Sequence, residues 1–484
     1  MTNKLQSYLI LAMMHFASMV FSQKLSAELK KYINDPVISK AKNSIMAIDL
    51  KSGDTLISHQ AKLPLVTAST TKLFSTAMAL ELLGPTFRFN TRLYADGKIK
   101  EGVLNGDLWI RGGGDISFGS HYFYSGREEN ASFKLLIDSI LSKGIRVITG
   151  NVYIDASAFG YEGTPYGWSS ADIGNYYGAF PAGLNFYDNV ADYFFSTGEV
   201  GEKAKFVGSY PPQQGLVLNN QVVSAKISQE SVNLKGKAYD LHRTVTGKLP
   251  AHKAKYKIKS TVADPERTFG NLFSQQCSAN GIQLKNACIP MRSSKKPLPD
   301  YARLKLICNL PGKTVMEIID LTNKKSVNFF AEGLLNGTAY HTTGKGTNSN
   351  GLKTIRKYLG ERIDTTKLKL VDGSGLSRSN RISAAHLCRI LTYIYKSNFY
   401  TDFKNSLPVA GVSGTIKDLC AGQDCAKRVV AKSGTMSGIK SYAGYITTVS
   451  GRTLVFSIIT SGHQGNQDYV IQKMENLLNA LVAQ

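Results

Sequence analysis

The most constraining feature of the sequence is a loop that leads into a buried helix, Ala-Ser-Thr-Thr-Lys-Leu-Phe-Ser-Thr-Ala-Met-Ala-Leu at residues 68–80. Apolar residues recur at helical spacing from Leu73 to Leu80, so this helix presents a stripe to a core. Ser69 stands at its start, where hydroxyl side chains commonly cap free backbone N–H groups. Lys72 lies one turn in and opposes the positive end of the helix dipole. A residue that departs from a local sequence preference, as Lys72 does here, is a candidate functional residue.

Ser69 and Lys72 have the spacing of a nucleophile and its base. Residues i and i+3 share a helix face, so the amine can reach the hydroxyl. Burial and the helix dipole both lower the pKa of a lysine, and a neutral lysine can accept the serine proton near pH 7. The same pattern also occurs at Ser39–Lys42, Ser293–Lys296 and Ser437–Lys440, so the motif needs support from elsewhere in the chain.

Two further motifs supply groups that acyl transfer needs. Ser326-Val327-Asn328 falls in a break between two helical patterns, and Lys432-Ser433-Gly434-Thr435 ends a strand near the C-terminus. Acyl transfer requires a nucleophile, a base, a proton route to the leaving group and an oxyanion hole. We expect Ser69 to attack, Lys72 to take its proton and Ser326 to pass a proton to the leaving amine.

The remaining motif residues are expected to bind substrate. The asparagine would orient the base and hold a substrate amide, and the second lysine and the threonine would bind a carboxylate. The serine beside that lysine adds a hydroxyl donor, and the glycine permits close backbone approach. The expected substrate-binding set from these motifs is Asn328, Lys432, Ser433, Gly434 and Thr435.

The composition indicates a folded, basic protein. The chain has 484 residues, of which 43% are hydrophobic, enough for two or three domains with buried cores. The formal net charge is +23. Such an excess favours an anionic membrane or cell-wall surface as a partner, or is simply a solvated basic surface. Nothing in the sequence supports binding to nucleic acid.

Residues 1–22 predict export. Lys4 precedes a short apolar run, and Val20 and Ser22 fit the small-residue rule for cleavage, with Gln23 as the first mature residue. The run is typical of a secretory signal peptide rather than of a spanning helix, and an uncleaved anchor is the alternative. The protein is therefore expected in the periplasm.

Six cysteines follow the signal peptide, and an even number in an exported chain suggests disulfides. Cys277 with Cys288 and Cys420 with Cys425 are the pairs closest in sequence. Cys308 and Cys388 then remain, either as a third pair or as buried thiols. No Cys-x-x-Cys or His-Glu-x-x-His pattern occurs, so no metal and no cofactor is expected.

Strand and helix patterns divide the chain. A hairpin at residues 44–50 and 55–58 precedes the Ser69 helix, and one or two inserted β-rich modules follow between residues 87 and 261. Helical periodicity then returns. The expected later helices cover residues 266–280, 314–322, 329–335, 349–360, 383–397 and 468–482, and the later strands cover 428–432, 442–448 and 453–460.

The three motifs, in this order, match the signature of penicillin-binding proteins and serine β-lactamases. Three further features narrow the match: the long insertion between the first two motifs, the Asp-Gly-Ser-Gly-Leu-Ser-Arg loop at residues 372–378, and the segments 106–114 and 150–155. On these residues the chain resembles the D-alanyl-D-alanine carboxypeptidase/endopeptidase family of low-molecular-mass penicillin-binding proteins. The resemblance covers nearly the whole mature chain.

The resemblance implies an α/β (α+β) fold, in which a transpeptidase-like domain with a central antiparallel sheet flanked by helices is split by two inserted, mainly β domains. The catalytic domain would comprise residues 23–88 and 264–484, inserted domain II residues 89–160 and 236–263, and inserted domain III residues 161–235. The implied activity is that of a serine peptidase. It would cleave terminal D-Ala-D-Ala and D-Ala cross-links of peptidoglycan stem peptides through an acyl-enzyme, with β-lactams as inhibitors.

The resemblance also implies two more substrate contacts. An aspartate of the inserted region helps to bind the diamino acid side chain in such enzymes, and Asp155 is the candidate here. Arg378 is a candidate contact to the stem peptide. Ser433 replaces the commoner threonine and keeps the hydroxyl, so activity is expected to survive.

Two other functions compete with this one. A β-lactamase of the same fold would need a deacylation base, and the sequence shows no obvious acidic residue for that role; the large insertion is also foreign to such enzymes. A catalytically silent wall-binding protein would use only the basic surface, but the three intact motifs count against it.

Overall fold

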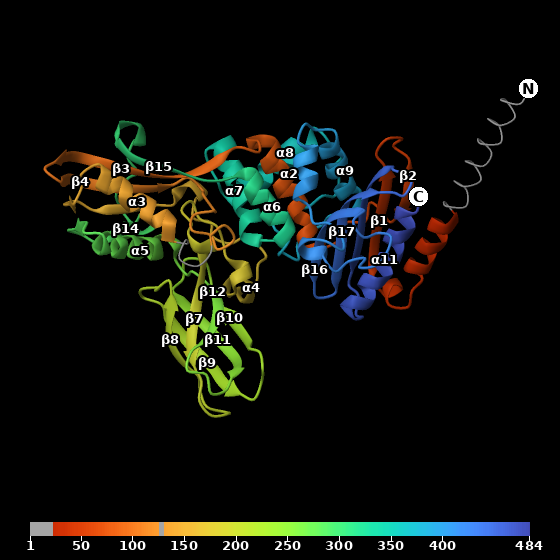
Figure 1. Cartoon of the computed structure of the whole chain (residues 1–484), viewed down its shortest axis with the longest axis horizontal. Coiled ribbons are helices and arrows are strands. Elements are labelled where there is room, and N and C mark those ends of the chain that lie inside the picture. Colours follow the sequence, from red (N-terminus) through yellow and green to blue (C-terminus); the bar gives the residue numbers. More distant parts are fainter. Residues whose placement is uncertain (1–22, 125–129) are drawn as a thin grey trace, which may run out of the picture. The chain divides into compact units, whose positions relative to one another are not determined.

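The computed structural model describes residues 23–124 and 130–484 (Figure 1). Its contacts divide the chain into two units. Unit 1 holds residues up to Glu81, together with Ile319–Ser326 and Ile355–Gln484, and unit 2 holds Leu82–Ile318 and Val327–Thr354. The predicted signal peptide lies outside the described residues. Within the described ranges, no helix is long and apolar enough to cross a membrane.

Unit 1 contains a five-stranded antiparallel sheet. Its strand order is β16 (Val429–Met436), β17 (Ile439–Thr447), β18 (Thr453–Ser461), β1 (Lys42–Asp49) and β2 (Thr55–His59). The N-terminal hairpin thus pairs with the C-terminal strands. Strands β17 and β18 are buried at nearly every position, so both faces of the sheet are covered.

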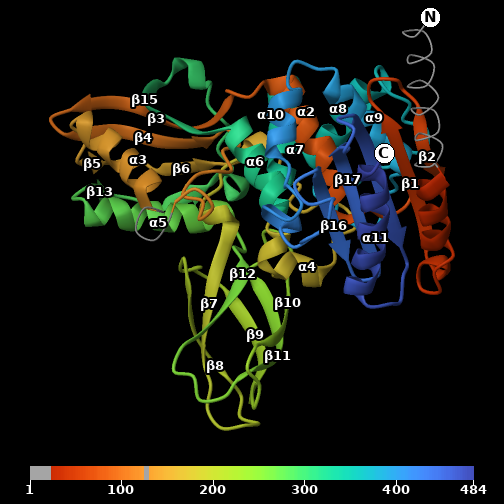
Figure 2. The same ribbon diagram turned by 45° about the vertical axis from the view of Figure 1, so that its right-hand side comes forward.

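Helices cover this sheet. Helix α9 (Ala384–Tyr395) packs against β1, β17 and β18, and α11 (Gln467–Val482) packs against β17, as Figure 2 shows for α11. The apolar stripe of α11 is buried in the core of the unit, at Val470, Met474, Leu477, Leu478 and Leu481. Helix α11 therefore docks on the sheet through this stripe. Residues 23–33 form a further helix.

The other predicted helices lie close to their predicted positions, whereas the short helix at residues 400–406 was not predicted. Unit 1 contains α10 (Tyr400–Ser406) and most of α2 (Lys72–Leu83), and unit 2 contains α7 (Asn328–Thr343). Helices α6 (Val315–Lys325) and α8 (Asn348–Gly360) have residues in both units. Helix α7 runs eight residues beyond the predicted end at Leu335.

Unit 2 is built on a seven-stranded sheet. Its main path is β13 (Gln283–Leu284), β5 (Val147–Ile148), β4 (Val103–Gly112), β3 (Arg88–Lys100) and β15 (Lys305–Thr314), and β6 (Val152–Asp155) joins β4 to β14 (Cys288–Pro290). Helices α3 (Ala131–Ser142) and α5 (Pro265–Ala279) contribute apolar residues to the same core.

Two three-stranded sheets complete unit 2 and appear yellow-green in Figure 1. One has the order β12 (Tyr256–Thr261), β7 (Val190–Ser196) and β8 (Lys205–Tyr210). The other has the order β10 (Ser231–Lys235), β11 (His242–Pro250) and β9 (Val217–Ala225), near the short helix α4 (Ser170–Gly174). The β-rich character predicted between residues 87 and 261 is confirmed, while the boundaries of two separate inserted domains stay a prediction.

Of the two disulfides expected from closeness in sequence, the structure contains one and lacks the other. Cys420 and Cys425 form a disulfide with Cα atoms 5.6 Å apart. The pair Cys277 and Cys288 is wrong, because both are free thiols. Cys277 lies on the buried face of α5 and Cys288 opens β14, and closeness in sequence does not orient two Cβ atoms toward each other. Cys308 and Cys388 are free thiols as well.

Candidate active site

A short 3₁₀ turn, Ala68–Thr71, positions the candidate nucleophile immediately before α2. Ala68 has a φ of 49°, a left-handed conformation that a residue with a Cβ rarely adopts. Residues i and i+3 eclipse each other in a 3₁₀ turn, so Ser69 and Lys72 face the same side. The Nζ of Lys72 accordingly lies 3.0 Å from the Oγ of Ser69.

Side chains tie this turn to β17. The Oγ of Ser441 donates to the Thr67 carbonyl oxygen over 2.6 Å, and it shares a hydrogen bond of 3.1 Å with the Oγ1 of Thr70. The hydroxyl of Thr71 donates to the Ala68 carbonyl oxygen over 2.8 Å. The left-handed conformation at Ala68 is thus held by several neighbours, as strained residues at functional sites usually are.

Lys72 is fully buried. Besides Ser69, its Nζ donates to the carbonyl oxygen of Ser374 over 2.7 Å. Ser374 belongs to the Gly- and Ser-rich loop that the sequence singled out. Both carboxylate oxygens of Asp372 hold this loop in place by accepting backbone N–H groups, from Gly375 over 2.9 Å and from Ser377 over 2.6 Å.

Gly375 allows the loop to pack on the Ala68–Thr71 turn, called the nucleophile turn below because it carries the candidate nucleophile Ser69. Its φ is +83°, and a Cβ at this position would lie 2.0 Å from the carbonyl oxygen of Ala68. No side chain fits there, so a glycine is required. The loop therefore fixes both the lysine and the backbone of the turn.

Ser326 follows the end of α6 with a φ of 59°, in the predicted break between helices. Its Oγ accepts a hydrogen bond of 3.0 Å from the Nζ of Lys432, which also donates to the Ser433 carbonyl oxygen over 2.8 Å. Lys432 is fully buried on β16. Burial, together with the charges of Lys72 and Lys440, holds the pKa of Lys432 well below its usual range.

The whole Lys-Ser-Gly-Thr motif lies inside β16, because the strand runs on to Met436 and not only to the predicted end at Lys432. A Cβ on Gly434 would lie 2.3 Å from the Thr67 carbonyl oxygen and 3.0 Å from the backbone nitrogen of Ser69. The hydroxyl of Ser433 shares a hydrogen bond of 2.7 Å with that of Thr415. The strand is therefore in direct contact with the nucleophile turn.

Three polar side chains lie near the outer end of β16, one of them on the strand itself. Thr435 is exposed, and its Oγ1 accepts a hydrogen bond of 2.9 Å from the Nζ of Lys440 on β17. Arg378, also exposed, donates to the carbonyl oxygen of Ser437 over 3.3 Å, in the turn between the two strands. Sequence reasoning missed Lys440 and Thr415. Lys440 stood in one of the Ser-x-x-Lys matches attributed to chance.

Two predicted residues belong to unit 2. Asn328 begins α7, two residues after Ser326 in the chain, and its Nδ2 donates to the carbonyl oxygen of Tyr177 over 2.9 Å. Asp155 is buried at the end of β6, where its Oδ2 accepts a hydrogen bond of 2.6 Å from the Tyr301 hydroxyl. The carboxylate of Asp155 is thus already engaged within its own unit.

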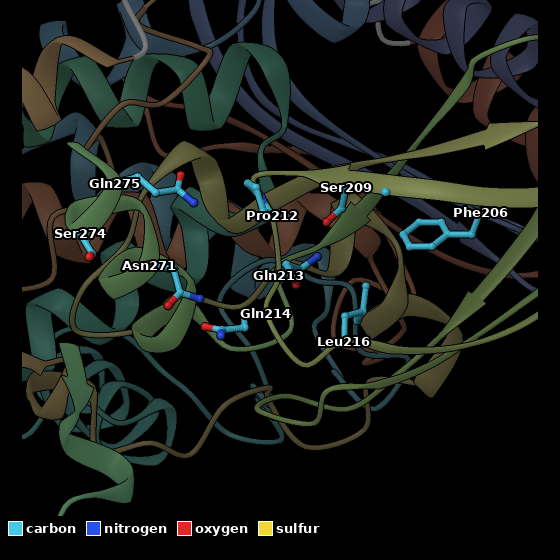
Figure 3. Close-up of a pocket in the computed structure, with 10 residues that line it drawn as sticks. Phe206, Ser209, Pro212, Gln213, Gln214, Leu216, Asn271, Ser274 and Gln275 are labelled. Carbon is cyan, nitrogen blue, oxygen red and sulfur yellow. The ribbon is translucent and has the colours of Figure 1, made fainter. Parts of the chain in front are cut away.

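Unit 2 also contains a cavity of about 610 Å³ between α5 and the β8–β9 connection. Figure 3 shows the amide groups of Asn271 and Gln275 directed from α5 toward the Pro212–Gln214 segment. None of the predicted site residues lines it. In the described parts of the chain, no group of three or more His, Cys, Asp or Glu side chains gathers as metal ligands do.

Known proteins resemble this chain over most of its length. The family model of the D-Ala-D-Ala carboxypeptidase 3 (S13) family matches residues 25–481. The D-alanyl-D-alanine carboxypeptidase of Actinomadura sp. (strain R39) is 27% identical and covers 93% of this chain and 83% of its own length. The D-alanyl-D-alanine carboxypeptidase DacB of Haemophilus influenzae is 25% identical over 86% of this chain and 85% of its own.

Solved structures show the same fold. Penicillin binding protein 4 of Haemophilus influenzae superposes with a TM-score of 0.81 at 22% identity, covering 95% of this chain and 99% of its own. The complex of that protein with a β-lactam gives a TM-score of 0.76 at 21% identity, covering 94% and 98%. The α/β fold predicted from the resemblance is therefore confirmed.

Fold and site together define a serine enzyme of the penicillin-binding, transpeptidase-like class. Within that class, the match over nearly the whole length shows that the chain belongs to the D-Ala-D-Ala carboxypeptidase 3 (S13) family. The family expected from the sequence motifs is thus confirmed.

Proposed function

We propose that this protein is a serine DD-peptidase that cleaves terminal D-Ala-D-Ala and D-Ala cross-links of peptidoglycan stem peptides. The observation that carries the proposal is the 3.0 Å contact between the Nζ of the fully buried Lys72 and the Oγ of Ser69. A buried amine within hydrogen-bond reach of a hydroxyl is the arrangement of a nucleophile and its base.

In the first step, Ser69 Oγ attacks the carbonyl carbon of the penultimate D-Ala while its proton passes to a neutral Lys72. The backbone N–H of Ser69 and that of a β16 residue near Thr435 stabilise the resulting oxyanion. Such preorganised donors commonly contribute a factor of about 10²–10³ to the rate. The contact of Gly434 with the Ser69 turn supports this pairing of strand and turn.

Collapse of the tetrahedral intermediate breaks the amide bond, and the leaving amine takes a proton through Ser326. The hydrogen bond from Lys432 to Ser326 supports this route. The lowered pKa of Lys432 also suits a group that exchanges protons, since a lysine with its ordinary pKa holds its proton too tightly near pH 7. Water then attacks the Ser69 ester, with Lys72 as base, and releases the shortened peptide.

The substrate contacts are part of the same proposal. Asn328 orients the base and a substrate amide, and the hydroxyls of Ser433 and Thr435 with Lys432 hold the terminal carboxylate. Arg378 contacts the stem peptide beside the β16–β17 turn. Asp155 binds the diamino acid side chain only if it exchanges its hydrogen bond with Tyr301 for one to the substrate.

β-Lactams are the proposed inhibitors, because their ring carbonyl presents the same acyl group to Ser69. We also propose that the mature protein acts in the periplasm. The net charge of +23 supports association with an anionic wall or membrane surface. Salt should then release the protein from purified wall sacculi, whereas retention that is independent of salt would argue against such a charge-based contact.

The decisive experiment digests purified peptidoglycan with the wild-type protein and with Ser69→Ala, and identifies the products by mass. We expect the wild type to release D-Ala and to open cross-links, and Ser69→Ala to do neither and to lose labelling by a fluorescent penicillin. Labelling of Ser69→Ala would refute the nucleophile. Rapid nitrocefin turnover would indicate a β-lactamase, and binding to sacculi without product would indicate a silent wall-binding protein.

A further inference from the structure

The cavity between α5 and the β8–β9 connection is lined by uncharged residues, although the chain as a whole has a formal net charge of +23. Its volume of about 610 Å³ lies within the range of about 300–1,000 Å³ that is usual for small-molecule sites. All of its lining residues belong to unit 2. The cavity therefore has the size of a ligand site, and its chemistry differs from that of the chain as a whole.

One wall of the cavity is a polar stripe on α5. Asn271, Ser274 and Gln275 have the spacing i, i+3 and i+4, so they share one face of the helix. Phe273 lies between them in sequence and is fully buried in the core. Figure 3 shows the two amide side chains of this wall directed toward the Pro212–Gln214 segment. The helix thus uses its polar face for the cavity and its apolar face for the core.

The facing wall is fixed by hydrogen bonds and is partly apolar. Gln213 holds the connection in place, because its Oε1 accepts a hydrogen bond of 2.6 Å from the backbone N–H of Ala263 and its Nε2 donates to the Tyr193 hydroxyl over 3.3 Å. Phe206 and Leu216, both partly buried, pack against the core of unit 2 and line the same cavity. Contacts within the protein therefore form the cavity without any ligand.

The amide of Asn271 provides an unused hydrogen-bond donor at this cavity. Its Nδ2 is buried and has no hydrogen-bond partner among the described residues. A buried N–H donor that stays unpaired destabilises a protein, so native structures usually supply a partner. Gln214 and Gln275 add two exposed amides to the lining. An acceptor on a bound molecule would pair the Asn271 donor.

These groups favour an uncharged ligand that carries hydroxyls and amides. A side-chain amide has both donors and an acceptor, so it can pair with either kind of group. An ionised group would lose its water here without meeting an opposite charge, which is unfavourable. The stem peptides of peptidoglycan carry ionised carboxylates and amines. Its glycan strands consist of N-acetylated sugars, whose hydroxyl and acetamido groups match the amides and whose C–H face matches Phe206 and Leu216.

We propose that this cavity binds the N-acetylated glycan strand of peptidoglycan. The acetamido carbonyl oxygen accepts from the Nδ2 of Asn271, and the sugar hydroxyls pair with Gln214 and Gln275. The sugar ring packs on Phe206 and Leu216. The inference rests on the proposed function, because it takes peptidoglycan as the substrate, and deepens it by adding a sugar-binding site that contains none of the predicted catalytic residues.

The test measures binding of chitotetraose, an uncharged oligomer of N-acetylglucosamine, to the full chain by isothermal titration calorimetry. Cellotetraose, which lacks the acetamido groups, is the comparison ligand. The variants are Asn271→Leu, Gln275→Leu and the control Gln276→Leu, which replaces the neighbouring glutamine of α5, a residue outside the cavity lining. Loss of one hydrogen bond between uncharged groups corresponds to a roughly fivefold change in affinity.

We expect the wild type to bind chitotetraose, and to bind cellotetraose about fivefold or more weakly. Asn271→Leu and Gln275→Leu should each weaken chitotetraose binding about fivefold, whereas Gln276→Leu should bind as the wild type does. Gln275 is exposed, so its replacement tests the site even if Asn271→Leu fails to fold. Penicillin labelling and cleavage of a glycan-free stem peptide should be unchanged in all three variants.

A wild type that does not bind chitotetraose overturns the inference. Equal affinity for the two sugars also overturns it, as does wild-type affinity in both cavity variants. Each of these results leaves the proposed function standing when the wild type releases D-Ala and is labelled by penicillin. A wild type that lacks these activities but binds chitotetraose through Asn271 and Gln275 refutes the proposed function and supports the sugar site.

Discussion

Gly434 and Thr67 approach so closely that a Cβ on the glycine would lie 2.3 Å from the Thr67 carbonyl oxygen. Thr67 precedes the nucleophile turn and Gly434 is the third motif's glycine, so the contact fixes the strand against the turn. The glycine thereby sets the distance between Ser69, the proposed nucleophile, and the strand that is proposed to supply an oxyanion donor.

The variant Gly434→Ala should force the strand away from the turn. We expect penicillin acylation of Ser69 to slow at least tenfold, since a displaced donor no longer meets the oxyanion. The free energy of unfolding should fall by about 1–3 kcal/mol from overpacking. The matched control is Gly360→Ala, where nothing lies within 4 Å of the added Cβ and stability should stay or rise. Wild-type acylation by Gly434→Ala would contradict the role of this contact.

Ser326 combines a left-handed backbone with the hydroxyl that Lys432 contacts. In Ser326→Gly the backbone strain is relieved while the hydroxyl is lost. We expect unchanged or higher thermal stability together with a fall in kcat of about a hundredfold or more, the usual contribution of a proton-transfer group. Steady-state cleavage of a D-Ala-D-Ala peptide measures the change in kcat, and a thermal melt measures the change in stability. A variant that keeps its kcat would exclude Ser326 from the proton route.

Substrate affinity should depend on pH through Lys440, because this lysine donates a hydrogen bond to the Thr435 hydroxyl that is proposed to hold the terminal carboxylate of the substrate. Burial lowers the pKa of Lys440 to about 8, against the pull of Asp468, and Lys432 also faces it. The lysine is a cation below that pH and loses its charge above it, so KM for a carboxylate-terminated peptide should rise between about pH 8 and 9. Lys440→Met should lack this rise, and a rise that persists in the variant would assign it to another group.

Lys440 also makes the free energy of unfolding depend on pH, and here a rise in pH is favourable. Its pKa in the folded protein, about 8, lies below the ordinary value of 10.5. Unfolding therefore takes up a proton between these two values, and the contribution of Lys440 to the free energy of unfolding increases as pH rises through that window. Denaturant titrations of the wild type and Lys440→Met at pH 7 and pH 10 should show a larger gain for the wild type; equal gains would contradict this sign.

The disulfide between Cys420 and Cys425 should contribute modestly to stability. It closes a short loop, with the two cysteines five positions apart, and the chain-entropy estimate for such a loop is about 2 kcal/mol. The double variant Cys420→Ser/Cys425→Ser should lose that amount in denaturant unfolding without losing penicillin labelling. Dithiothreitol should lower the stability of the wild type but not of the double variant. A loss of labelling would indicate that the loop positions β16, the strand that carries the Lys-Ser-Gly-Thr motif.

Much of unit 1 could be predicted from sequence patterns that span only a few residues. The spacing of Ser69 and Lys72 predicted their contact because helical geometry over three residues is nearly fixed. The break at Ser326 was equally visible, between two clear helical periodicities. Lys440 could not be recognised in this way, because only the pairing of β16 with β17 places it beside Thr435.

Unit 2 was less predictable. Helix α3 was missed although Phe133, Leu136, Ile137 and Ile140 carry a helical stripe, because the surrounding segment is rich in β-like pieces. Strand β15 was missed because the proline at position 311 argues against a strand, and here it lies at an edge of the sheet, where it is tolerated. The cysteine pairs depended on side-chain directions that sequence spacing does not contain.

The sheet of unit 1 places the first hairpin of the chain beside its last strand, with Lys42 opposite Ser461. A chain synthesised from its N-terminus therefore carries the nucleophile turn long before the strands that support it exist. Contacts between residues so far apart in sequence form slowly and late. Hydrolytic activity should consequently appear only once the C-terminal strands have joined the sheet, so nascent or truncated chains should be inactive.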